Sequence, residues 1–164
     1  MQQVLYFYEG ECEEKLLKFL KHKEIIKSGK TTKFNLWQDK IKQLKRLLPR
    51  HRKSELYFLI DTDKLANIQL FKDNLENLKQ HNICLIVQYK NLEDELSYIC
   101  DQTRTELFSE FNACNKDEFT SKFIKASNLQ SKLNSCDFSK IWSRGTDFMQ
   151  KNSIEISKNC KYRL

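Results

Sequence analysis

The chain alternates between short, continuously apolar runs and longer segments in which apolar residues recur every three or four positions. Three runs, at 4–8, 56–60 and 83–87, are apolar throughout. Such runs are typical of strands that are buried on both faces of a parallel sheet. A shorter alternating stretch at 33–37 predicts a weaker strand, which is the second along the chain.

Helical spacing of apolar residues predicts a helix in each interval between these strands, at 12–27, 37–48 and 68–78. Strands that alternate with helices predict an α/β fold, with a mainly parallel, Rossmann-like sheet of four strands and helices on both faces. If the strand order is the common 2-1-3-4, the winding direction reverses between the strands at 4–8 and 56–60.

From residue 91 onward the apolar spacing is helical throughout. The 164-residue chain contains one proline and three glycines, so no Pro/Gly-rich linker divides it. We therefore expect an α/β domain over 1–100 and a helical extension over 101–164 that packs on this core.

Acidic residues follow two of the predicted strands at their carboxyl ends. Glu9 and Gly10 follow the first strand, whereas Asp61 and Asp63 follow the run at 56–60. Open parallel sheets bind ligands beyond the carboxyl ends of their strands, and a carboxylate near an apolar strand requires a partner. The sequence therefore predicts a Mg²⁺ or Mn²⁺ site with these candidate ligands: Glu9, Glu13, Asp61, Asp63 and Glu93.

Each candidate also has a structural interpretation. Glu9 would be a solvated residue at a strand end, and Glu13, like its acidic neighbours, would be favoured near a helix amino terminus. Asp63 would be the N-cap of the following helix. Glu93 would lie in the first turn of a helix that Asn91 caps.

A net charge of +7 and a pI near 9.0 permit a polyanionic partner. The segment 42–53 is rich in Lys and Arg and contains no acidic residue. It is either a nucleic-acid contact or a solvated face, because a helix-to-strand connection lies opposite the carboxyl ends of the strands. The candidate nucleic-acid-binding residues are Lys64, Lys90, Arg46, Arg50 and Arg52.

The six cysteines show no C-x-x-C pairing and no histidine at metal-ligand spacing. This pattern predicts buried thiols in a reducing compartment. The start of the chain lacks a basic leader region, and no apolar run approaches the roughly 18 residues that a membrane span requires. We therefore expect a soluble, cytoplasmic protein that does not associate with a membrane.

Residues 4–13 (VLYFYEGECE), 56–63 (LYFLIDTD) and 83–96 (ICLIVQYKNLEDEL) together resemble the Toprim domain, which topoisomerases, bacterial primases, recombination proteins and OLD-type nucleases share. The E-G-x-x-E form of the first motif is most similar to OLD-like and RloB-like Toprim nucleases of bacterial defence systems. The resemblance covers roughly residues 1 to 100 and depends chiefly on an E-G and a D-x-D at two strand ends.

The resemblance implies a role for each acidic candidate. Glu9 matches the invariant glutamate of the family, Glu13 the second acid of the OLD-like form, and Asp61 with Asp63 the D-x-D. Glu93 matches an acid beyond the fourth strand. The chain has no G-x-x-x-x-G-K-[ST] loop, so it lacks the ATPase half of OLD proteins, and it has no zinc ligands of the kind a primase needs.

The resemblance therefore implies a Mg²⁺- or Mn²⁺-dependent nuclease that acts on DNA or RNA in antiviral defence, with Glu9, Asp61 and Asp63 as catalytic residues. The alternative is a non-catalytic interaction subunit that uses the same scaffold to bind a separate ATPase or another protein. Convergence of the three carboxylates would favour the enzyme, and their separation would favour the scaffold.

Overall fold

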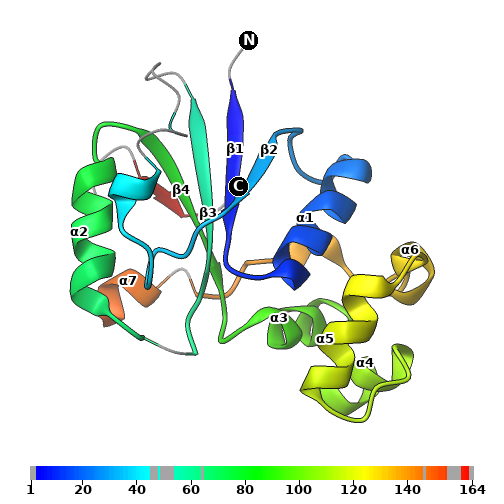
Figure 1. Ribbon diagram of the computed structural model, residues 1–164. Helices are drawn as coiled ribbons and strands as arrows, with labels where there is room; N and C mark the ends of the chain where they lie inside the picture. The colour runs from blue at the N-terminus through cyan, green and yellow to red at the C-terminus, as the bar shows by residue number, and fades with distance from the viewer. Residues whose placement is uncertain are drawn as a thin grey trace.

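Strands and helices alternate around one parallel sheet (Figure 1). The computed structural model describes these residues: 3–44, 48, 54–63, 65–145, 147–154 and the backbone of 160–162. The described strands pair in the order β2-β1-β3-β4-β5, and every pair is parallel. Their bounds are β1 Val4–Tyr8, β2 Lys30–Lys33, β3 Glu55–Asp61, β4 Asn82–Gln88 and β5 Cys160–Tyr162.

The predicted α/β class is confirmed, as is the order 2-1-3-4 of the first four strands. The winding direction therefore reverses between β1 and β3, the two strands that end in acidic residues. The short strand β5 was not predicted. It pairs with β4 and extends the sheet, so the segment beyond residue 100 is not wholly helical.

Helices cover both faces of the sheet because strand side chains alternate between the faces. Tyr6 stacks on Tyr57 on one face, and Phe7 stacks on Phe58 on the other. The first face packs against α1 Glu11–His22, α3 Leu92–Ile99, α4 Arg104–Glu110, α5 Lys116–Lys125 and α6 Leu129–Lys132. The second packs against the 3-10 helix η1 Ile41–Gln43, α2 Ile68–Leu78 and α7 Phe148–Lys151; a second 3-10 helix, η2, covers Phe138–Lys140.

Two predicted elements are wrong in kind or position. The strand expected at 33–37 lies at Lys30–Lys33, and the helix expected over 37–48 is replaced, within the described residues, by η1. The buried Asn74 side chain accepts a hydrogen bond from the Ile41 N–H and donates to two backbone carbonyls, those of Leu36 and Asp39. These tertiary hydrogen bonds satisfy backbone groups that a helix would otherwise have paired.

The prediction that all six cysteines are free thiols is wrong. Cys100 and Cys136 form a disulfide that ties the end of α3 to the segment before η2. Cys12 and Cys84 are buried free thiols as expected, but Cys114 is exposed. Among the described helices, none is both long and apolar enough to cross a membrane.

Candidate functional site

The acidic candidates follow strands at the carboxyl edge of the sheet. This is the lower edge in Figure 1, near α3. Glu9 directly follows β1, and Asp61 is the last residue of β3. Because β1 and β3 are neighbouring parallel strands, their ends lie side by side. Asp61 is paired in register with Gln88 of β4, which brings a third strand end to the same place.

Glu9 is largely buried and only half satisfied by hydrogen bonds. Its Oε2 accepts a hydrogen bond from Asn35 Nδ2 at 2.9 Å, whereas the buried Oε1 has no hydrogen-bond partner of acceptable geometry within the described part of the chain. Burial, followed by the charge of Asp61 and smaller contributions from Glu13 and Asp63, raises the pKa of Glu9 to about 8. The carboxyl group can therefore hold a proton near neutral pH.

Asp61, at the end of the neighbouring strand β3, is also partly buried among other acids. The side-chain amide of Gln88, which is fully buried, donates a hydrogen bond to Asp61 Oδ1. Burial and the charge of Glu13 are the main causes that raise the pKa of Asp61 to about 7, although the Gln88 hydrogen bond opposes this rise. Two neighbouring strands thus each present an acid that is destabilised when ionised.

Glu13 combines a structural role with membership of this cluster. Its Oε2 accepts a hydrogen bond from the Gly10 backbone N–H at 3.0 Å, so the interpretation as a helix-start residue is confirmed. Its side chain is nevertheless buried, and its charge contributes to the raised pKa values of Glu9 and Asp61. Burial also raises the pKa of Glu13 itself.

Asp63 is exposed at the rim and is not the N-cap of α2, because Asn67 occupies that position. Asn91 Nδ2 donates to Asp63 Oδ2 at 3.3 Å. The turn is held by Lys90, whose carbonyl accepts from the backbone N–H groups of Thr62 and Asp63 at 2.8 and 3.0 Å. The loops after β3 and β4 therefore form one unit, with the Asp63 carboxylate available to solvent.

Glu93 is buried beside the cluster but faces cations. Lys116 Nζ lies 3.2 Å and Arg104 Nη2 3.9 Å from its Oε2. Asn91 caps α3 as predicted, so Glu93 does occupy the first turn. Its charge adds to the raised pKa of Asp61, yet two basic residues from α4 and α5 already balance it. Glu93 is thus a peripheral member of the site.

Whether this cluster can hold a divalent cation depends on the acids that have no basic partner among the described residues. In the part of the chain that the structure describes, no group of three or more His, Cys, Asp or Glu side chains is placed to hold a metal ion. Glu9, Asp61 and Asp63 therefore do not converge on one ion position as the enzyme interpretation expects, and the cluster is not a preformed coordination shell. Mg²⁺, however, keeps several waters and takes only one or two protein carboxylates. The unpartnered Glu9 Oε1 and the adjacent Asp61 fit that requirement.

Sequence reasoning missed the amides that hold these acids. Gln88 ends β4 at the same edge, so the strand-end rule that found Asp61 also applies to it. Asn35 arrives from the segment after β2 and carries no comparable signal. Of the predicted nucleic-acid contacts, Lys90 is exposed beside the cluster, and the others lie outside the described residues: Lys64, Arg46, Arg50 and Arg52.

The chain matches no protein-family model, no curated protein and no solved structure. The carboxylate cluster, with its raised pKa values and its position at the reversal point of the sheet, is therefore the feature from which a function is inferred.

We predict that the metal-free protein becomes more stable as the pH falls from 8 to 6. The folded pKa values of about 8 for Glu9 and about 7 for Asp61 exceed the ordinary values of 4.5 and 3.8. At these two carboxyl groups only the folded state takes up protons in this range, so their contribution to the free energy of unfolding rises as pH falls, on the order of 2 kcal/mol. Urea denaturation in EDTA at several pH values measures it.

The control for this pH effect is the double variant Glu9→Gln/Asp61→Asn. It should lose most of the dependence between pH 8 and 6, because the two groups that take up protons are gone. A wild-type stability that is flat, or that rises with pH, would contradict the pKa shifts.

A second prediction concerns Glu95, an acid with a purely structural role. It is fully buried, and it accepts hydrogen bonds from the backbone N–H groups of Trp142 at 2.8 Å and Tyr89 at 3.2 Å, with Arg144 Nη2 at 3.6 Å. Glu95→Ala should lower the free energy of unfolding by about 3 kcal/mol, since it leaves buried donors and a cation unpaired. Urea denaturation measures the loss, with Glu110→Ala on exposed α4 surface as the control; a loss below about 1 kcal/mol would contradict this role.

Proposed function

We propose that the protein is a Toprim-type nuclease that hydrolyses phosphodiester bonds of DNA or RNA with Mg²⁺ or Mn²⁺, and that it acts in bacterial antiviral defence. One observation carries the proposal. Glu9 and Asp61, at the ends of the adjacent strands β1 and β3, are both partly buried and both have raised pKa values at the point where the sheet reverses direction. Parallel sheets bind ligands at this point.

The proposed ligands are the acids of the cluster. Asp61 and Glu9 would bind the ion directly, with Asp63 at the solvent-facing rim and Glu13 at the base. A bound divalent ion would polarise a phosphoryl oxygen and lower the pKa of a bound water. Glu93 would act outside this group, since Lys116 and Arg104 already balance its charge.

The chain's own groups have distinct tasks in this proposal. Gln88 fixes the orientation of Asp61, and Asn35 fixes one oxygen of Glu9. Glu9 has two alternative tasks: it binds the ion, or it keeps the proton that its pKa of about 8 allows it to carry and exchanges that proton with the attacking water or the leaving oxygen. Lys90 is exposed beside Asp63, where a cation would attract a phosphate backbone.

A cleavage assay tests this function. Purified protein would be incubated with single-stranded DNA, plasmid and tRNA in Mg²⁺, Mn²⁺ or EDTA, and the products resolved on denaturing gels. Cleavage of at least one substrate that requires a divalent ion, and that an Asp61→Asn preparation lacks, supports the proposal. Absence of cleavage with every substrate and metal would favour the non-catalytic interaction subunit, which a pull-down with a candidate ATPase would then examine.

A further inference from the structure

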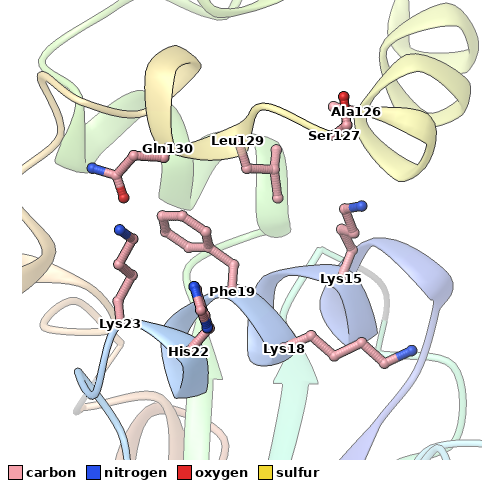
Figure 2. Close-up of a pocket in the computed structure, with 9 residues that line it drawn as sticks. All are labelled: Lys15, Lys18, Phe19, His22, Lys23, Ala126, Ser127, Leu129 and Gln130. Atoms are coloured by element: carbon pink, nitrogen blue, oxygen red, sulfur yellow. The ribbon is translucent and has the colours of Figure 1, made fainter.

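A cavity of about 330 Å³ lies between α1 and the segment around α6, apart from the carboxylate cluster (Figure 2). Its volume is within the range of about 300 to 1,000 Å³ typical of small-molecule sites. No acidic residue lines it. The lining residues are Lys15, Lys18, Phe19, His22, Lys23, Ala126, Ser127, Leu129 and Gln130.

The interior of the cavity is apolar and contains an aromatic ring. Figure 2 shows the Phe19 side chain pointing from α1 into the space beneath the segment that carries Leu129 and Gln130. The ring of Phe19 is only partly buried, and its other neighbour is Phe138 at a centroid distance of 5.6 Å. Part of this aromatic surface is therefore open to a ligand, and a flat ring system would stack on it.

The rim of the cavity is cationic. Lys15 and Lys18 lie on α1, Lys23 directly follows its last turn, and all three line the cavity. Lys18 pairs with Glu14 at 2.6 Å, whereas the ammonium groups of Lys15 and Lys23 have no ion-pair partner among the residues that the structure describes. Favourable interaction with the helix dipole does not account for Lys15, which lies well before the last turn of α1.

The positions of these two lysines indicate the class of ligand. Lys15 and Lys23 are eight residues apart, which places them about 12 Å apart along the helix axis, on either side of Phe19. An amphiphile with one anionic head group would use only one of them. A nucleic-acid strand instead carries a phosphate on each side of every base, and stacking on an aromatic residue holds the base.

We infer that this cavity binds one nucleotide of single-stranded nucleic acid, with the base on Phe19 and Leu129 and the flanking phosphates on Lys15 and Lys23. The strand is single because a paired base in a duplex is not free to enter the cavity. The cavity would bind the nuclease substrate at a distance from the carboxylate cluster. This role as a substrate site rests on the proposed nuclease function. Binding itself requires neither metal nor catalysis.

Fluorescence anisotropy with a labelled oligodeoxythymidylate of 12 nucleotides, in EDTA, tests the phosphate contacts. Lys15→Ala/Lys23→Ala should weaken binding about tenfold and reduce the slope of log K against log salt by about 1.4, or about 0.7 for each lost phosphate. The control, Lys40→Ala/Lys72→Ala, removes the same charge on the side of η1 and α2 and should leave the slope unchanged. Equal effects of the two double variants would overturn the site.

The aromatic contact is tested in the same assay. Phe19→Leu should weaken binding about tenfold, whereas Phe19→Trp should retain it, because only the latter keeps a stacking surface. Thermal unfolding verifies that both variants are folded. Wild-type affinity in folded Phe19→Leu, or equal affinity for an abasic oligomer, would overturn the base contact.

Competition experiments separate the possible sources of the ligand. A duplex of equal length should compete at least about tenfold less well than the single strand. Thymidine monophosphate should compete only weakly, since it offers one phosphate; competition as strong as that of the oligomer would reassign the site to free nucleotides. Stronger competition by an acidic, phenylalanine-containing peptide would reassign it to a protein partner. The inference fails in either case, whereas a failed cleavage assay leaves these binding results intact.

Discussion

Asp61→Asn is expected to lose more than about 100-fold of the metal-dependent cleavage rate while the protein keeps its full stability. Asparagine retains an Oδ1 that can accept the hydrogen bond from Gln88, so the local structure is preserved. It removes one of the charges that raise the pKa of Glu9, so the free energy of unfolding without metal should be unchanged or about 1 kcal/mol higher.

Initial cleavage rates and urea denaturation in EDTA measure the two effects of Asp61→Asn. The matched control is Asp101→Asn, which makes the same chemical change at an exposed position after α3 and should alter neither quantity. A clear loss of stability in Asp61→Asn would identify Asp61 as a structural residue and contradict its role as a metal ligand.

The sheet was predictable because its strands carry their own signal. Runs that are buried on both faces must be apolar throughout, and β1, β3 and β4 satisfy this condition. Helix α2, Ile68–Leu78, was predicted because its apolar spacing is regular, although Asn67 and not the predicted Asp63 caps it. In these elements local propensity and tertiary packing favour the same structure.

The elements that were missed depend on distant partners. Trp37 and Ile41 have helical spacing, but Trp37 stacks on Phe71 and the Ile41 N–H is bonded to Asn74. The apolar residues of this segment are buried against the sheet face that carries Phe7 and Phe58, by a turn and not by a helix. Strand β5 has only three residues and no apolar run, and it forms by pairing with β4. Nothing local in either segment indicates these contacts.

The candidate site, like the fold, was predictable where the strands alone position its residues. Glu9 and Asp61 were found because parallel strands bring their carboxyl ends to one edge. The pairing of Glu93 with Lys116 and Arg104 was not foreseen, since it depends on how α4 and α5 return to α3. The structure thereby separates acids that resemble one another in the sequence. Basic residues balance Glu93, whereas Glu9 and Asp61 have no ion-pair partner among the residues that the structure describes.

The largest expected effect of a single change on turnover, apart from that of Asp61, comes from Glu9→Gln. Glu9 Oε2 is held by Asn35, and burial together with the charge of Asp61 raises the pKa of Glu9 to about 8. A carboxyl group that holds its proton near neutral pH is suited to proton transfer, which typically contributes 10²- to 10⁴-fold. Glu9→Gln should therefore lower kcat by about 100-fold or more.

The concentration of metal at half-maximal rate distinguishes proton transfer from metal binding at Glu9. If Glu9 transfers a proton, Glu9→Gln should keep this concentration within about twofold of wild type, and excess Mn²⁺ should not restore the rate. If Glu9 is mainly a ligand, the metal concentration at half-maximal rate should rise. Excess Mn²⁺ should then restore part of the rate, because mass action refills the weakened site. The control is Glu11→Gln, which neutralises an exposed acid two residues away and should leave the rate unchanged. Full turnover in Glu9→Gln at ordinary metal concentration would mean that the end of β1 takes no part in the chemistry, and the proposed site would then have to be abandoned.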